Sequence, residues 1–228
     1  MSVQQSELGY KLLVFDWDGT LMDSLSRIAM CMRAAAVDVG IAPVTEHEVH
    51  QVVGLALDLA IKQLHPQLSP AQVEQMRQRY SHHYVEAEQT PSAFYEGIPE
   101  MLRRLAKTDV ALSVATGKSR KGLNRVFWAH DVAGLFHSSR CADETRSKPE
   151  PDMLLEILEF HKVQPKDAIM VGDTEFDLEM ASRAQVPSVG VTWGAHDITR
   201  LQKHAPQICV NTVAELSDWL FNRNLRNP

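Results

Sequence analysis

The sequence has no long apolar segment. No apolar run approaches the roughly 18 residues that a membrane-spanning helix needs, so no membrane role is expected. The N-terminal stretch MSVQQSELGY lacks the basic and then apolar pattern of a secretory signal. We therefore expect a cytoplasmic protein.

Cysteine and basic residues are also scarce. Cys31, Cys141 and Cys209 are far apart and odd in number, which fits packing residues in a reducing compartment better than a disulfide framework. Lys and Arg number 23 against 29 Asp and Glu, giving a net charge of -6. This balance argues against a nucleic-acid partner bound through a basic surface.

The first third of the chain combines one buried strand with a helical segment. With 228 residues and 44% apolar content, the chain can form one large domain or two unequal ones. Residues 11–15 contain the apolar run Leu12–Phe15 and precede a glycine-containing turn, which predicts a buried strand. Helical patterns are then expected over 25–39, over 49–64 with a break near Gly54, and from Ser69 and Pro70 to about 88, before Thr90, Pro91 and Ser92 end them.

The rest of the chain alternates between short apolar strands and amphipathic helices. This alternation predicts βα units and a parallel sheet. We expect an α/β fold with a Rossmann-like parallel sheet core, residues 1–23 and 92–228, and an inserted all-helical cap domain, residues 24–91. The expected strands are 110–115, 136–140, 168–171, 188–192 and 208–210, and the helices are 99–107, 119–130, 151–161, 176–184 and 213–221.

Polar residues follow the expected strands at the point where each strand ends. In open α/β sheets, ligands bind beyond the carboxyl ends of the strands, so these residues can meet in one place. One further candidate, Lys148, lies in a loop before a helix. The strand-end candidates are Asp16 and Asp18 after the first strand, Thr116 and Gly117 after the second, and Asp173 and Asp177 after the strand over 168–171.

If these residues meet, four carboxylates repel one another and one lysine does not offset this repulsion. A divalent cation would remove most of it. Oxygen ligands with room for water suit Mg²⁺. A magnesium ion beside a lysine and small hydroxyl and amide donors also forms a phosphate site. One carboxylate could then attack phosphorus, as in aspartyl-phosphate enzymes.

The motifs FDWDGTLMDS, VATGKS, KPEP and VGDTEFD resemble the four signature motifs of the haloacid dehalogenase superfamily, in the same order and spacing. The helical insertion after the first strand resembles the subfamily of phosphoglycolate phosphatases, β-phosphoglucomutases and dehalogenases. The sequence looks most like phosphoglycolate phosphatase-like enzymes. The resemblance implies a Mg²⁺-dependent phosphatase that hydrolyses a small phosphomonoester, phosphoglycolate or similar, through an aspartyl-phosphate.

The resemblance also implies the catalytic roles. Asp16 would be the nucleophile, and Asp18 the general acid that protonates the leaving oxygen and then activates water. Dehalogenases lack an aspartate at the position of Asp18, so its presence favours a phosphate ester as substrate. Lys148 would neutralise charge on Asp16 and the phosphoryl group.

The binding roles are carried over in the same way. Thr116 and Gly117 would hold the phosphoryl oxygens. Gly54 and Leu55 resemble the cap loop that reaches toward the substrate and would set specificity. The implied metal ligands are Asp16, Asp18 through its backbone carbonyl, Asp173 and Asp177.

Two other functions remain open. A phosphomutase is disfavoured because residues 53–57 contain no basic residue to hold a second phosphate. A non-catalytic binding protein would be favoured by loss of a catalytic residue, and none is lost. The expected partner is a small phosphorylated metabolite, and the chain is expected to be a monomer or a homodimer.

Several single features have competing interpretations. Lys118 could contact phosphate or be a solvated lysine at a helix start. His82 and His83 are adjacent and point to different helix faces, which disfavours a zinc pair. Trp193 could line the cleft or serve packing alone.

Overall fold

The chain forms a six-stranded parallel sheet in the order β3-β2-β1-β4-β5-β6. The computed structural model describes residues 9–86 and 92–222. Two expectations fall outside these residues: the end of the helical pattern at Thr90 and Pro91, and the last residues of the helix that was expected to run to about 88. The α/β prediction is confirmed. The strands are β1 (Leu12–Phe15), β2 (Ala111–Thr116), β3 (Ser138–Cys141), β4 (Ala168–Gly172), β5 (Ser188–Val191) and β6 (Ile208–Val210).

Strand β1 lies at the centre of the sheet and is buried on both faces. Leu13 and Phe15 belong to one hydrophobic cluster, whereas Leu12 and Val14 belong to another. Side chains alternate between the two faces of a strand, so a central parallel strand must be apolar at every position. This explains why the first strand is an unbroken apolar run rather than an alternating one.

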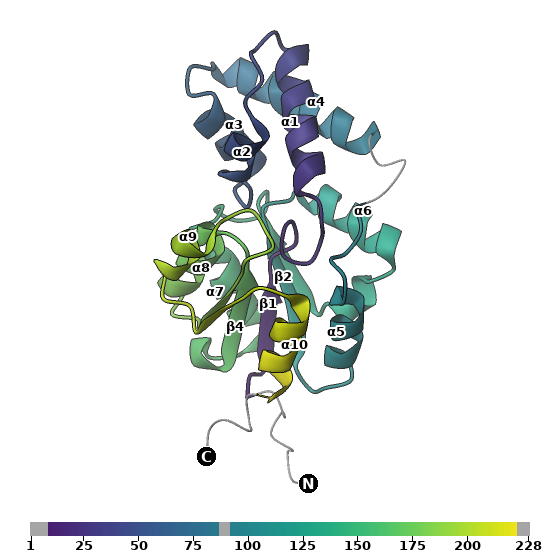
Figure 1. The fold of residues 1–228 in the computed structure, drawn as a ribbon, viewed down its shortest axis with the longest axis vertical. Coiled ribbons are helices and arrows are strands. Elements are labelled where there is room, and N and C mark those ends of the chain that lie inside the picture. Colours follow the sequence, from purple (N-terminus) through teal and green to yellow (C-terminus); the bar gives the residue numbers. More distant parts are fainter. Residues whose placement is uncertain (1–8, 87–91, 223–228) are drawn as a thin grey trace.

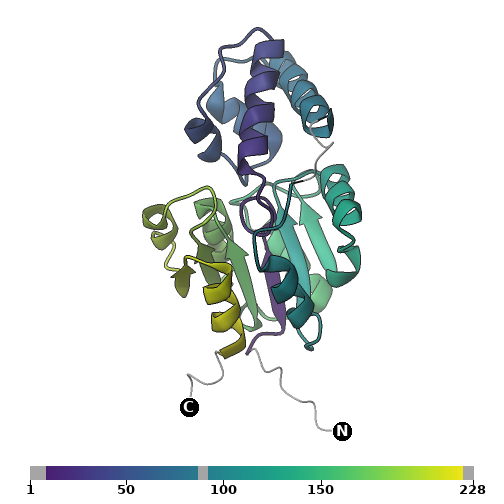
Figure 2. The same ribbon diagram turned by 45° about the vertical axis from the view of Figure 1, so that its right-hand side comes forward.

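Helices cover both faces of the sheet, as Figure 2 shows. One cluster gathers the apolar residues of α5 (Ile98–Leu105), α6 (Arg120–His130) and α10 (Val213–Asn222). The other gathers those of α7 (Asp152–His161) and α8 (Glu175–Arg183).

The short helix α9 (Ile198–Gln202) was not expected from the sequence. Asp197 caps it by accepting hydrogen bonds from the backbone N–H groups of Thr199 at 2.8 Å and Arg200 at 3.1 Å. A helix of five residues is too short for an apolar periodicity to reveal it.

Four helices form a separate layer beyond the carboxyl ends of the strands (Figure 1). They are α1 (Leu25–Asp38), α2 (Glu46–His50), α3 (Leu57–Leu64) and α4 (Pro70–Glu86), and they share their own hydrophobic cluster. The helical pattern expected from residue 49 begins earlier, at Glu46, because Thr45 and Glu48 form a capping box there. We propose that this layer is the cap domain, residues 24–91, and that the remainder is the core domain.

The chain leaves and re-enters the sheet region through two adjacent segments. The backbone N–H of Asp23 donates to the carbonyl of Ala93 at 2.9 Å, and that of Tyr95 donates to Leu21 at 3.0 Å. Both connections of the helical layer therefore lie side by side, next to the end of β1.

Candidate active site

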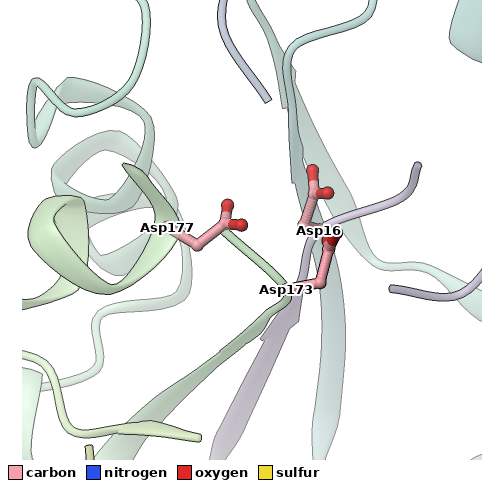
Figure 3. Close-up of side chains that lie close together, drawn as sticks. All are labelled: Asp16, Asp173 and Asp177. Carbon is pink, nitrogen blue, oxygen red and sulfur yellow. The ribbon is translucent and has the colours of Figure 1, made fainter. Parts of the chain in front are cut away.

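Three buried aspartates meet at the carboxyl ends of β1 and β4. Asp16 directly follows β1, Asp173 follows β4, and Asp177 lies in the first turn of α8. One carboxylate oxygen from each lies within 4.8 Å of the others. Figure 3 shows the three side chains converging from the two strand ends and the helix. The sequence prediction that these residues lie together agrees with this geometry.

Lys148 lies beside two of these aspartates. Its Nζ is 2.6 Å from an oxygen of Asp16 and 2.6 Å from an oxygen of Asp177, and the lysine side chain is fully buried. Burial opposes the charge of Lys148, but the two carboxylates outweigh burial and raise the pKa of Lys148. The site therefore contains a permanent buried cation.

A single lysine does not balance three carboxylates. Burial, together with the charges of Asp177 and Asp173, raises the pKa of Asp16 well above its ordinary value despite Lys148. Burial and the charge of Asp177 likewise raise the pKa of Asp173 to about 7. Asp16 Oδ2 is buried and has no hydrogen-bond partner within the described part of the chain. Such an oxygen beside two more carboxylates has the donor chemistry that suits Mg²⁺.

Hydrogen bonds hold Asp173 and Asp177 in place. Asp173 accepts from the Thr20 hydroxyl at 2.7 Å and from the Ala195 backbone N–H at 2.7 Å. Asp177 Oδ2 accepts from the Thr174 hydroxyl at 2.7 Å and from its N–H at 3.1 Å, which completes a capping box at the start of α8. Asp177 thus caps its helix with one oxygen and turns the other toward Lys148.

Two glycines pack so closely on Asp173 that no side chain fits there. A Cβ on either Gly19 or Gly194 would lie 2.2 Å from side-chain atoms of Asp173. Trp193 is half-buried and donates through Nε1 to the Thr20 carbonyl at 3.1 Å. Gly194, expected with Trp193 to line the cleft or to serve packing, thus packs on Asp173. Sequence reasoning missed Thr20 as a support of the site, and its position in the motif that follows β1 was the available signal.

Asp18 lies apart from the three carboxylates and faces the helical layer. Both of its carboxylate oxygens accept from Lys118 Nζ at 2.8 Å, and Oδ1 also accepts from the Ser24 hydroxyl at 2.6 Å. Lys118 Nζ further donates to the hydroxyl of Tyr84, on α4, at 3.2 Å. The interpretation of Lys118 as a solvated lysine is therefore wrong, because its side chain is enclosed between Asp18 and the cap helix.

The remaining predicted residues lie at the boundary between the helical layer and the sheet. Thr116 is buried, and its hydroxyl accepts from the Lys118 backbone N–H at 3.2 Å. A Cβ on Gly117 would lie 2.7 Å from the carbonyl oxygens of Gly54 and Leu55, so the predicted specificity loop is packed against the predicted phosphate-binding glycine. A cavity of about 790 Å³ between the layers is bordered by Asp16, Asp18, Gly54, Leu55 and Gly117, among others.

Two of the histidines make polar contacts within the fold. His83 Nε2 lies 2.8 Å from Asp38, next to Arg79 on the same carboxylate. His196 is buried and accepts through Nδ1 from the Glu175 N–H at 3.0 Å, and burial lowers the pKa of His196 to about 4. Within residues 9–86 and 92–222, the only group of side chains with metal-ligand spacing is the three aspartates.

A family model described as haloacid dehalogenase-like hydrolase matches residues 13–191, which include all four motifs. The chain belongs to this family. The match agrees with the observed parallel sheet and with the buried aspartate after β1. The resemblance inferred from the motifs is thereby confirmed.

Curated relatives of this haloacid dehalogenase-like hydrolase include phosphatases. A phosphoglycolate phosphatase of Vibrio vulnificus strain YJ016 is 30% identical over 216 residues, covering 91% of this chain and 95% of the relative. A phosphoglycolate phosphatase of Vibrio cholerae is 31% identical over 192 residues, covering 81% and 85%. The chain is accordingly a phosphoric monoester hydrolase that resembles phosphoglycolate phosphatases.

Solved structures show the same fold. A hydrolase from Pseudomonas syringae superimposes with a TM-score of 0.84 at 22% identity and covers 92% of this chain and 97% of its own. A haloacid dehalogenase-like family hydrolase from Streptococcus pneumoniae has a TM-score of 0.81 at 21% identity, with coverages of 92% and 98%.

None of the helices among the described residues combines the length and apolar character needed to cross a bilayer.

Proposed function

We propose that the chain is a Mg²⁺-dependent phosphatase that hydrolyses a small-molecule phosphomonoester through an aspartyl-phosphate on Asp16. The observation that carries this proposal is the environment of Asp16. Its carboxylate is buried beside the cation of Lys148, has one oxygen without a hydrogen-bond partner among the described residues, and borders the cavity between cap and core. A carboxylate held this way is placed for nucleophilic catalysis.

Mg²⁺ fits the residues present. The carboxylates of Asp16, Asp173 and Asp177, with the backbone carbonyl of Asp18, would hold it. Oδ2 of Asp16, which has no hydrogen-bond partner in the described part of the chain, is an oxygen that a hard cation satisfies. When bound, Mg²⁺ neutralises the carboxylates and the phosphoryl oxygens, which lowers the repulsion between two negatively charged reactants.

The side chains account for both halves of the reaction. A carboxylate oxygen of Asp16 attacks phosphorus, the bond from phosphorus to the ester oxygen breaks, and Asp18 gives its proton to the departing alkoxide. Asp18 then takes a proton from water as that water attacks the phosphorus of the acyl phosphate. Inorganic phosphate leaves and the Asp16 carboxylate is restored.

Three groups stabilise the transferring phosphoryl group. Lys148 supplies a positive charge beside Asp16, while the Thr116 hydroxyl and the Gly117 N–H are the proposed donors to the phosphoryl oxygens. Such preorganised electrostatic stabilisation supplies most of the rate in phosphoryl transfer. Packing of the loop around Gly54 and Leu55 against Gly117 would shield the site from water other than the attacking molecule.

Phosphoglycolate is the first substrate to test, because the named relatives act on it. The absence of a basic residue in 53–57 disfavours a phosphomutase, which must hold a second phosphate. We retain a monomer or homodimer and a cytoplasmic location as predictions.

The decisive experiment measures phosphate release from a panel of phosphomonoesters, including phosphoglycolate, hexose phosphates and nucleotides. We expect release with Mg²⁺, none after chelation, and none from Asp16→Asn. Full activity in the chelator would contradict the metal requirement. Phosphoryl transfer to a sugar phosphate in place of water would identify a mutase, and absence of any turnover would favour a binding protein.

A further inference from the structure

The proposed general acid, Asp18, is held by two groups that lie at the boundary between core and cap. Its Oδ1 accepts from the hydroxyl of Ser24, the residue immediately before α1, at 2.6 Å. Both of its carboxylate oxygens accept from Lys118 Nζ at 2.8 Å. The side chains of Asp18 and Lys118 are largely buried, so solvent has little access to this contact.

Tyr84 of α4 completes the contacts of Lys118. A lysine ammonium has three N–H donors. Two of them point to Asp18, and the third donates to the Tyr84 hydroxyl at 3.2 Å. Nζ also lies 4.8 Å from the centre of the Tyr84 ring, within reach of a cation–π interaction. Burial raises the pKa of Tyr84 although Lys118 opposes this, so the phenol stays neutral near pH 7. Tyr84 therefore fixes the direction of the ammonium group.

The position of Tyr84 is set by the cap. Tyr80 and Tyr84 are four residues apart and lie on the same face of α4. Their ring centres are 5.7 Å apart, and both rings pack against the hydrophobic cluster shared by α1–α4. The hydroxyl of Tyr84 consequently moves with α4 and not with the sheet.

Other hydrogen bonds between cap and core do not involve Asp18. The Ala56 N–H donates to the Ser147 hydroxyl at 2.8 Å, and the Arg200 side chain donates to that of Gln51. A loosened cap can therefore be distinguished from a misdirected general acid, because different bonds are responsible for the two effects.

We infer that Tyr84 is a positioning residue for departure of the leaving group: it fixes Lys118, and Lys118 orients the Asp18 carboxyl group for donation to the ester oxygen. This inference rests on the proposed phosphatase function and adds a cap residue to it. Because the hydroxyl moves with α4, protonation of the leaving oxygen is complete only when the cap lies against the core. Tyr84 itself forms no bond to phosphorus and gives up no proton.

The test is the dependence of the rate on the leaving group. Phosphoglycolate and glucose 6-phosphate release primary alkoxides, which must be protonated, whereas 4-nitrophenyl phosphate releases a stable phenolate. The value of kcat/KM reports the steps up to this departure and excludes the later attack of water. For Tyr84→Phe, we expect the ratio of kcat/KM for the better alkyl ester to that for 4-nitrophenyl phosphate to fall by at least about 3-fold.

Two further substitutions serve as controls. Tyr10→Phe also removes a tyrosine hydroxyl, which donates to Gln207 at 2.9 Å beside the start of β1, and should leave the ratio unchanged. Ser147→Ala loosens the cap without changing a contact of Asp18, so kcat/KM should change by the same factor for both esters.

A second variant and a double-mutant cycle tie the effect to Lys118. Tyr84→Leu loses the ring as well and should lower the ratio further, and thermal unfolding checks that both variants are folded. If Tyr84 acts through Lys118, Tyr84→Phe should have no further effect on the ratio in Lys118→Met.

Several outcomes would overturn the inference while leaving the phosphatase function intact. They are a fall in the ratio of less than about 3-fold in folded Tyr84→Phe, an equal fall in Ser147→Ala, and losses that multiply in the double variant. Release from 4-nitrophenyl phosphate alone would show that departure is not assisted by an acid and would overturn it too. No release from any of the three esters by the unmodified protein would overturn the phosphatase function itself, and the inference with it.

Discussion

Lys118 and Asp18 form an enclosed ion pair, with the lysine Nζ 2.8 Å from both carboxylate oxygens. The side chains of Lys118 and Asp18 are 10% and 12% exposed. The pair joins residues 100 positions apart in the sequence and brings the hydroxyl of Tyr84, from the cap, to the same ammonium group. The orientation of the proposed general acid is thus linked to the position of a cap helix.

Loss of this pair should impair proton transfer to the leaving group. General acid catalysis contributes about 10²–10⁴-fold. Lys118→Met removes both ammonium contacts of Asp18 and keeps the Ser24 hydroxyl bond, so we expect kcat for alkyl phosphates to fall by about 10–100-fold. The loss should be smaller for 4-nitrophenyl phosphate, whose leaving group needs no proton. Steady-state kinetics with both esters measure the difference. Lys121→Met, at an exposed position three residues along, is the control, and equal losses for both esters would rule out this role.

Removal of the nucleophile should abolish turnover without unfolding the protein. Asp16→Asn keeps the size of the side chain but cannot form the acyl phosphate, so we expect kcat to fall by more than about 10³-fold. Phosphate release and circular dichroism test the two parts. Asp167→Asn, which alters a half-buried aspartate paired with Lys11 on the surface, should retain full activity. Substantial residual activity in Asp16→Asn would assign the nucleophile elsewhere.

Stability should depend on pH and Mg²⁺ together. The pKa of Asp173 is about 7 in the folded protein against 3.8 ordinarily, so the folded state binds this proton more tightly than the unfolded state does. For this group, the metal-free protein then loses stability as pH rises from about 4 to about 7. Mg²⁺ counters the repulsion between the ionised carboxylates.

We therefore expect Mg²⁺ to raise Tm more at about pH 8 than at about pH 5, where protons compete for the carboxylates. Thermal unfolding with Mg²⁺ or with a chelator at both values measures this. Ca²⁺ and Na⁺ at matched ionic strength separate site binding from screening. An equal shift in Tm at the two pH values would show that these carboxylates do not bind the ion.

Contact between the cap loop and Gly117 should be needed for activity but not for folding. A Cβ on Gly117 would lie 2.7 Å from the Gly54 and Leu55 carbonyl oxygens, so Gly117→Ala must displace the loop. We expect kcat/KM to fall by about 10-fold or more, since misplacement of about 1 Å can cost 10²-fold, with little change in Tm. Gly122→Ala on α6, where the nearest contact is 3.4 Å, should keep activity and gain about 0.5–1 kcal/mol of stability. Unchanged kcat/KM for Gly117→Ala would show that this contact is dispensable.

The sequence allowed accurate prediction of the strands and of the residues that follow them. Apolar runs such as 12–15 and 168–171 have a local cause, because buried parallel strands need apolar side chains on both faces. Since the carboxyl ends of parallel strands meet at one edge, Asp16 and Asp173 were expected to be close, and their carboxylates are. Helix boundaries were less accurate: α2 begins at Glu46 because of a side-chain capping box rather than an apolar period.

The sequence by itself determined the βα order, the helical insertion and the set of carboxylates, because hydrophobic periodicity and strand ends are properties of neighbouring residues. Only the tertiary structure decided the partner of Lys118, the contact of Gly54 with Gly117, and the close packing of Gly194 on Asp173. These relationships join residues far apart in sequence, and their geometry depends on how the helices pack on the sheet, which no local pattern encodes.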